Sequence, residues 1–451
     1  MALWSNAHEA IPSFSVAIIS CLYTVSQQER LARTLSRTAS GEPIEADRRE
    51  RLLRVLSAAT FLIFVQAYMV APLLPRLSQV FGVPVQTMGL IVPAYLIPYG
   101  IATLFYGLLS DRVGRRRVLL ASLTTFILLT ALTATSGSVS QMLVWRLLTG
   151  FGAAGVVPLA LILMGDLFPY EQRGRPLGWL FGAMAGGAAF GAPMGVMLES
   201  FIGWQALFLG GALLAAGVLA LLLPYKALLG GRPAMRRMSF RGVLTGYRGL
   251  LGTGRGLRTY GYVLWNGIFH SGVFTWLGLY FSRRYGLSEV GIGLAILGYG
   301  IPGFLLGPII GRAADRWGRR WLVPAGVGIG AAASTALILD LPLFGATLAV
   351  IVLSLGYDMT QPLLAGIVTT LGGRERAGQA MGLNVFTLFT GFGIGSYLFG
   401  EALRMGFTPA LGLFSAIQVA AALAALPLFR SETRFYEDGV TGETLDRSPG
   451  R

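Results

Sequence analysis

Gly107-Leu-Leu-Ser-Asp111-Arg112-Val-Gly114-Arg115-Arg116 is followed 204 residues later by Gly311-Arg-Ala-Ala-Asp315-Arg316-Trp-Gly318-Arg319-Arg320. The same offset aligns further glycine, proline and tyrosine residues on both sides of this stretch without a gap. The aligned pairs include Gly82 with Gly286, Gly89 with Gly293, Tyr95 with Tyr299, Pro98 with Pro302, Pro158 with Pro362, Gly187 with Gly391 and Gly191 with Gly395. The chain is therefore predicted to contain two parallel copies of one unit.

Composition indicates that each copy is built of membrane spans. Hydrophobic residues make up 54% of the chain and charged residues 13%, whereas soluble domains carry about 25% charged residues. Apolar runs long enough to cross a bilayer as α-helices recur twelve times, six in each repeat. The expected spans are 53–75, 85–110, 117–136, 139–165, 176–200, 203–225, 259–282, 289–310, 321–340, 343–370, 376–400 and 407–429. The predicted fold class is an all-α polytopic membrane protein, and parallel repeats of spans are typical of transporters.

The placement of the basic residues predicts the orientation of these spans. Alternate loops, starting with 111–117, carry 20 Lys and Arg residues, and the loops between them carry four. This asymmetry places the basic loops and both termini in the cytoplasm, with the protein in the cell membrane. The net charge of +15 therefore does not indicate nucleic-acid binding. All basic residues but one are Arg, which favours a bacterial origin.

Five segments are expected along the chain. They are an N-terminal extension (1–52), a six-helix bundle (53–225), a basic cytoplasmic linker (226–258), a second six-helix bundle (259–429) and a cytoplasmic tail (430–451). The extension contains an uncharged run, 11–25, and is either disordered or lies upstream of the true start of translation; an interfacial helix is the alternative. Cys21 is the sole cysteine, so an internal disulfide and thiolate metal sites are excluded.

The repeated stretch resembles the signature loop between spans 2 and 3 of the major facilitator superfamily, and the resemblance covers about residues 55 to 430. In that family the loop latches the two halves in the outward-facing state. A carboxylate at this place can also lie against the positive N-terminal end of a neighbouring helix. The resemblance implies a gating role for the matching residues; a cluster that only sets topology is the alternative. These residues are Asp111, Arg112, Gly114, Arg115, Asp315, Arg316, Gly318 and Arg319.

Spans 4 and 5 carry two further motifs of the same family. Arg146-Leu-Leu-Thr-Gly150-Phe-Gly152 resembles its span-4 signature, and an arginine at this depth needs a partner or a wet cavity unless it reaches the outer surface. Span 5 resembles the glycine-rich signature of the antiporters, although its proline stands one place late. Its expected packing residues, which share one helix face, are Gly187, Gly191, Pro193 and Gly195.

Polar residues fall on spans 1, 4, 7 and 10, which line the central cavity in this superfamily. Asp358 is the predicted protonation site, with His270 as its modulator and Arg146 as a further coupling residue, because intramembrane ionisable residues mark proton relays. A static hydrogen-bonded pair of Asp358 and His270 is the alternative. The expected substrate-cavity residues are Gln66, Asn266, Gln361, Tyr95, Tyr299 and Trp276.

These features favour a secondary transporter over an enzyme or a channel. No nucleophile elbow or metal-ligand cluster occurs, and His8 and His270 are far apart in sequence. Proton-coupled efflux of small organic molecules or drugs by alternating access is the predicted function, and proton symport of a sugar or organic acid is the alternative. We expect no cofactor and no metal, a monomer, and contacts with substrate, protons and membrane lipids. The sequence does not identify the substrate.

Overall fold

The computed structural model describes residues 42–168, 172–230 and 240–432. The chain divides into two compact units, Met1–Arg54 and Val55–Arg451. Every element in the described part is a helix, which confirms the predicted fold class.

The first repeat is built from short and long helices. They are α2 (Glu42–Tyr68), η1 (Ala71–Leu73), α3 (Leu74–Phe81), α4 (Val85–Gly89), α5 (Pro93–Val113), α6 (Arg115–Thr133), α7 (Val139–Ala153), α8 (Val156–Leu167), α9 (Gly174–Leu222), η3 (Leu223–Tyr225) and η4 (Leu228–Gly230). Gly203 interrupts α9 with a φ of 78°, so α9 contains both span 5 and span 6.

The linker and the second repeat follow the same plan. Their helices are α10 (Phe240–Leu251), α11 (Gly254–Thr275), α12 (Leu277–Tyr285), α13 (Glu289–Ile296), α14 (Ile301–Trp317), α15 (Arg319–Ala336), α16 (Leu343–Leu371), α17 (Gly373–Ala402), η5 (Leu403–Met405) and α18 (Phe407–Leu428). Helices of the described part that are long and apolar enough to cross a membrane number nine, and one of them, Gly174–Tyr225, covers two expected spans. The expected spans 259–282 and 321–340 are helical but fall outside this set.

Glycines with positive φ recur at matching places in the two repeats. Gly82 and Gly286 end helices at φ 62° and 63°, and Gly114 and Gly318 join two helices at φ 102° and 78°. Side chains other than glycine rarely adopt this conformation. The glycine of the repeated stretch is therefore needed for the sharp turn between α5 and α6, and between α14 and α15.

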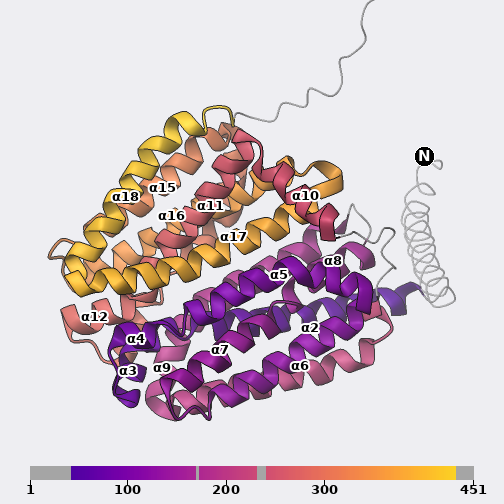
Figure 1. Ribbon diagram of the computed structural model, residues 1–451, viewed down its shortest axis with the longest axis horizontal. Coiled ribbons are helices and arrows are strands. Elements are labelled where there is room, and N and C mark those ends of the chain that lie inside the picture. Colours follow the sequence, from indigo (N-terminus) through magenta and orange to yellow (C-terminus); the bar gives the residue numbers. More distant parts are fainter. Residues whose placement is uncertain (1–41, 169–171, 231–239, 433–451) are drawn as a thin grey trace, which may run out of the picture. The chain divides into compact units, whose positions relative to one another are not determined.

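The two repeats meet along α5 and α17. Helix α17 packs against α11 of its own repeat and against α5 of the first repeat (Figure 1). Gly100 of α5 permits this approach, because a Cβ there would lie 3.2 Å from the Phe386 carbonyl oxygen. On the other side of the second repeat, α15 packs against α16 and α18.

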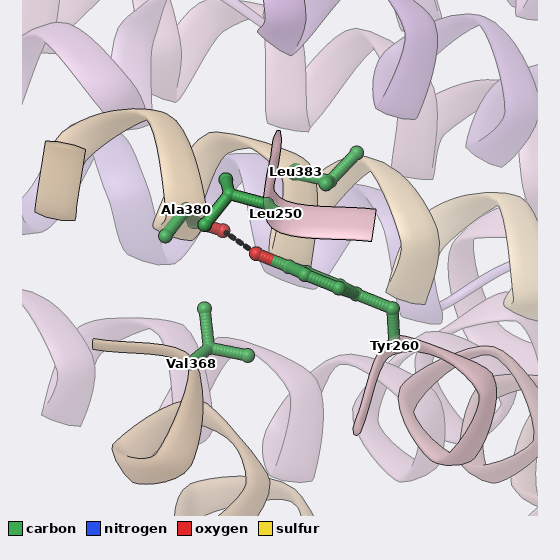
Figure 2. Packing of buried hydrophobic residues seen from close by; sticks show 5 residues of the cluster. All are labelled: Leu250, Tyr260, Val368, Ala380 and Leu383. Carbon is green, nitrogen blue, oxygen red and sulfur yellow. Dashed lines mark hydrogen bonds between the residues drawn. The ribbon is translucent and has the colours of Figure 1, made fainter. Parts of the chain in front are cut away.

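The predicted linker, 226–258, contains the helix α10. Leu250 of this helix belongs to a buried cluster with Tyr260 of α11, Val368 of α16, and Ala380 and Leu383 of α17 (Figure 2). The Tyr260 hydroxyl donates to the Ala380 carbonyl at 3.0 Å. An apolar face on α10 thus fastens the linker to the end of the second repeat.

The chain termini also differ from expectation where they are described. Helix α2 begins at Glu42, inside the predicted extension; residues 1–41 and 433–451 lie outside the described residues. Glu432, predicted to lie in a cytoplasmic tail, is buried. Its carboxylate accepts from Arg255 at 2.8 and 2.7 Å and pairs with Arg258. The end of α18 is therefore fastened to the start of α11.

Candidate functional site

A cavity of about 510 Å³ lies between the two repeats and is largely apolar. Aromatic side chains from α2, α11, α16 and α17, together with one just before α14, form much of its wall. They are Phe64, Tyr68, Phe274, Tyr299, Tyr357, Phe389 and Phe392. The lining also includes Asp358, His270, Ser354, Gln361 and Asn384, and its described residues include no arginine or lysine. Among the described lining residues, Asp358 is thus the one carboxylic acid.

The repeats are in contact at the end of the bundle opposite the basic loops. A Cβ on Gly278 would lie 2.9 Å from the Pro72 carbonyl oxygen, and one on Gly293 would lie 2.3 Å from Met197 Cγ. A Cβ on Gly393 would similarly approach Ile97 Cγ1 to 2.4 Å. These close approaches seal the cavity at that end.

At the basic-loop end, glycines of α9 and α14 face open space. A Cβ on Gly178 or Gly182 of α9, or on Gly307 or Gly311 of α14, would meet no described atom within 4 Å. Phe181 of α9 and Gly307 of α14 both line the cavity. The cavity therefore extends toward the end of the bundle that carries the basic loops.

Asp358 lies on the cavity wall and is held by hydrogen bonds from two neighbouring elements. The Ser354 hydroxyl donates to its Oδ2 at 3.0 Å, and the Gly300 N–H donates to Ser354 Oγ at 2.9 Å. The Gly303 N–H also donates to the Asp358 carboxylate. The carboxylate thus contacts the beginning of α14 both directly and through one serine.

His270 lines the same cavity but does not form the static pair with Asp358. The imidazole packs edge-to-face against Tyr357, with ring centroids 5.2 Å apart, and against Phe269 at 5.0 Å. Neither ring nitrogen has a hydrogen-bond partner in the described part. Two buried nitrogens without partners are uncommon, so this imidazole has free hydrogen-bonding capacity beside the cavity.

Asn266 and Gln361 form one network behind the wall. The Asn266 amide donates to Gln361 Oε1 at 3.2 Å, and the Thr360 hydroxyl donates to Asn266 Oδ1 at 3.1 Å. Gln361 lines the cavity, whereas Asn266 does not. The network orients Gln361 from the rear, so Asn266 supports the wall without being part of it.

Arg146 is fully buried and reaches neither the cavity nor the outer surface. Its guanidinium lies over the Tyr95 ring, 4.3 Å from the centroid, and its Nε donates to the Ile91 carbonyl at 3.4 Å. Its Nη1 and Nη2 lack partners among the described residues. A cation–π contact offsets part of the cost of burying this charge. Tyr95 thus stabilises Arg146, and it is not among the residues that line the cavity.

Gln66 and Trp276 also lie away from the lining, contrary to expectation. Both polar atoms of the buried Gln66 amide lack partners in the described part. The Trp276 indole N–H donates to the Ser396 carbonyl at 3.0 Å, and its ring fills the space left by Gly89 and Gly400. Trp276 is therefore a packing residue that helps to close the sealed end.

The signature loop of the first repeat is tied to span 4. Arg115 forms an ion pair with Asp166 at the end of α8, while Asp111 is half-buried and Arg112 is exposed. In the second repeat the Arg319 guanidinium lies beside α16, because a Cβ on Gly366 would be 3.0 Å from Arg319 Nη2. Arg316 is exposed, and the Asp315 side chain lies outside the described part.

The glycines of span 5 lie against span 1. A Cβ on Gly187 would be 2.5 Å from the Phe61 carbonyl oxygen, and one on Gly191 would be 2.7 Å from the Val65 carbonyl oxygen. A Cβ on Gly195 would be 2.6 Å from Met69 Cβ. Pro193 is buried in the same helix.

Sequence reasoning missed several residues of this site. The aromatic pairs Phe64–Tyr68 and Phe389–Phe392 stand at helical spacing on spans 1 and 11, and this spacing could have indicated a shared wall. Ser354 stands one helical turn before Asp358 and was detectable in the same way. The break in span 8 before Gly300 carries no such periodic signal.

Residues 56–396 and 266–441 match the family model of the Major Facilitator Superfamily. Among relatives, the uncharacterized MFS-type transporter YwfA of Bacillus subtilis is 26% identical over 406 residues, which cover 88% of this chain and 95% of YwfA. Multidrug resistance protein 3 of Bacillus subtilis is 31% identical over 119 residues, 26% of this chain and 23% of that protein. Further relatives match over part of their length, up to 65%.

A solved structure with a similar fold is the crystal structure of a D-xylose-proton symporter. It superposes with a TM-score of 0.67 at 18% identity and covers 85% of this chain and 99% of the symporter. At this level of identity the likeness concerns the fold.

Proposed function

The chain belongs to the Major Facilitator Superfamily and is a membrane transporter, and from this premise we propose that it exports small organic molecules in exchange for protons by alternating access. Asp358 carries the coupling proton in this proposal. The supporting observation is a cavity whose wall is mostly aromatic and aliphatic, and whose described lining holds one carboxylic acid, Asp358, and no arginine or lysine. Intramembrane carboxylates in such positions serve as proton relays in pumps and transporters.

The chemistry of the wall bears on the substrate class. Aromatic rings and aliphatic side chains bind lipophilic solutes, and the rings also attract cations. A sugar would need many hydrogen-bonding groups, and an organic anion would need a positive charge in the cavity. Lipophilic neutral or cationic molecules therefore suit this wall best, and the multidrug relative is in accord with that class.

The direction of the open end supports a cytoplasm-facing state. The excess of Arg on alternate loops predicts that the basic-loop end faces the cytoplasm, and the cavity extends toward that end. In such a state the exporter would take up its substrate from the cytoplasm or from the inner membrane leaflet.

Inside-out vesicles test the proposal. Vesicles that contain the protein, when energised by a proton gradient, should accumulate a fluorescent lipophilic cation, and an added gradient of the cation should drive protons outward. Vesicles with the Asp358→Asn variant should bind the cation without concentrating it. Accumulation that persists after the gradient is dissipated contradicts the proposal.

Proton symport of a sugar or organic acid is the second candidate, favoured by a partial relative, the 4-hydroxybenzoate transporter PcaK of Pseudomonas aeruginosa, which is 33% identical over 152 residues, 34% of each chain. Intact cells and a radiolabelled panel of sugars and organic acids distinguish the two. Symport predicts gradient-dependent uptake of one of these solutes, whereas export predicts increased resistance of the cells to toxic lipophilic compounds.

A further inference from the structure

Span 8 is broken at its middle, in a way that the first repeat does not copy. Helix α13 ends at Ile296 and α14 begins at Ile301, with Gly300 at φ 94° between them. The other positive-φ glycines in the described part lie at helix ends or between spans. At the position equivalent to Gly300 the first repeat has Leu96, inside α5. Span 2 of the first repeat is also interrupted, since α4 ends at Gly89 and α5 begins at Pro93, but no residue there has a positive φ. A break with a left-handed glycine therefore belongs to the second repeat alone.

The Asp358 carboxylate holds the N-terminal end of α14 at this break. The Gly303 N–H contacts it directly, and the Gly300 N–H contacts it through Ser354. The N-terminal end of a helix carries a partial positive charge, which an anion stabilises. A Cβ on Gly303 would lie 2.5 Å from Asp358 Oδ1, so glycine at this position is what lets the carboxylate approach.

The break also marks the boundary between the closed and open parts of the cavity. A Cβ on Gly300 would lie 2.5 Å from Ala189 Cβ of α9, so spans 5 and 8 touch there. Beyond the break, Gly307 and Gly311 face open space, and across the cavity Phe181 and Met184 of α9 line the opposite wall. Helix α14 is thus the section of span 8 that has room to move.

We propose that the negative charge of Asp358 pins α14 in the open position, and that its neutralisation frees α14 to turn at Gly300 toward α9 and close the cavity. The inference rests on the proposed function, in which Asp358 carries the coupling proton. Ser354 is a positioning residue, because its hydroxyl connects the Gly300 N–H to the Asp358 carboxylate. An empty carrier with a charged Asp358 cannot close, and only a bound proton or a cationic substrate releases it. Of the lipophilic molecules that suit the wall, this device therefore selects the cations. The pin thereby prevents futile cycles that would dissipate the gradient.

Four titratable groups face Asp358 or its immediate surroundings. Tyr68 of α2, Tyr299 before α14 and Tyr357 of α16 are close enough to interact with its charge, and His270 of α11 packs on Tyr357. Phenols titrate near pH 10, outside the working range. A change with pH could therefore come from Asp358 or from His270, and the test must distinguish their effects.

Distance measurement between spin labels tests the pin. Labels at Gly311→Cys on α14 and Gly412→Cys on α18, in a Cys21→Ser background, both stand in open space and within the second repeat. Rocking of whole repeats leaves this distance unchanged, whereas a turn at Gly300 changes it. For the purified protein in nanodiscs we expect a second distance population that grows as the pH falls from mildly alkaline to mildly acidic.

Substitutions show which residue causes the pH response of this distance. Asp358→Asn should show the low-pH distribution at every pH, and Ser354→Ala should show part of it at alkaline pH, while Ser354→Thr keeps the link. His270→Gln should retain the pH response. Ser334→Ala, which removes a buried hydroxyl bonded to Ser415 at 2.8 Å, is the matched control and should behave as the parent.

Two outcomes overturn the inference: distances in the parent that do not change with pH, and an Asp358→Asn variant that still follows the pH as the parent does. Transport assays separate this failure from that of the proposed function. If Asp358→Asn loses coupling while its distances follow the parent, only the pin is wrong. If Asp358→Asn still concentrates substrate, the proposed function itself is wrong.

Discussion

Arg115, which follows the sharp turn at Gly114, forms an ion pair with Asp166 at the end of α8. The pair joins the signature loop of the first repeat to span 4. Asp111 of the same loop is half-buried and outside this pair. Its charge nevertheless acts on the Arg115 guanidinium, so both carboxylates lie around one arginine.

We therefore expect Asp111→Asn to slow the transport cycle, because the charge that would hold a helix end in the closed state is lost. The amount of inserted protein should remain near that of the parent. Asp315→Asn should have a weaker effect of the same kind. Asp340→Asn, which removes an exposed carboxylate paired with Arg284 at 2.5 Å, is the control. Parent-like initial rates in both motif variants would show that the loops do not gate transport.

The proton gradient should be the energy source. A potential of about 100 mV contributes about 2.3 kcal/mol per net charge moved, enough for about fiftyfold accumulation of a neutral substrate exchanged for one proton. Exchange of one proton for a monovalent cation moves no net charge, so the pH difference drives it. An uncoupler should abolish transport, whereas depletion of ATP with the gradient maintained should leave it intact. Both are measured with the same dye-accumulation assay in vesicles.

Asp358→Asn should abolish concentrative transport while substrate exchange remains measurable, since the amide keeps the shape but cannot release a proton. His270→Gln should shift the pH optimum more than it lowers the maximal rate, because the imidazole lines the cavity without bonding to Asp358. Exchange and net accumulation are measured separately with labelled substrate. If the Asp358→Asn variant accumulates substrate against a gradient, another residue carries the coupling proton, and Asp166 or Arg146 is the next candidate.

Gly191→Ala should destabilise the first repeat. The new Cβ would lie 2.7 Å from the Val65 carbonyl oxygen, and because this neighbour is backbone, α2 and α9 must separate, at a cost of about 1–3 kcal/mol. Gly182→Ala on the same helix meets open space and is the matched control. Thermal unfolding in detergent should show a lower midpoint for the first variant only; equal midpoints would contradict the packing role.

Glu432→Gln should also lower the thermal midpoint, because it leaves Arg255 and Arg258 without their anion, at a cost of about 1–3 kcal/mol. Burial raises the pKa of the Glu432 carboxyl, but the hydrogen bonds and charges of Arg255 and Arg258 outweigh it and hold the pKa below its ordinary value. A depressed pKa gives stability that is fully present above about pH 4.3, the ordinary value for Glu, and is lost as the pH falls through the lowered value. The difference in thermal midpoint between parent and variant should thus be constant near neutral pH and shrink in acid. A difference in midpoint that grows in acid would contradict this assignment.

The fold could be predicted because its signals are redundant. The repeat offset and the lengths of the apolar runs indicate the same helices, and the signature loop marks the same turn twice. Within the site, Asp358, His270, Gln361 and Tyr299 were predicted for the cavity and line it. They stand out because polar side chains are costly in a bilayer.

The remaining site residues could not be placed from sequence because cavity exposure depends on helix rotation and local breaks. Trp276 and Tyr95 are on the expected spans, but their rings point into contacts with Ser396 and Arg146. Gly300 cannot be distinguished by composition among 62 glycines. Its left-handed conformation depends on Ala189 and Ser354, which are distant in sequence.

The contact of Glu432 with the arginines at the start of α11 has a consequence for biosynthesis. Arg255 and Glu432 are 177 residues apart, so the ribosome completes the spans from α11 to α18 before the carboxylate is made. During that interval the two arginines at the start of α11 have no anion from this source. A chain truncated at Ser431 would contain all of these spans but lack the last link that joins them. Such truncated chains should be recognised by membrane quality-control proteases sooner than chains ending one residue later.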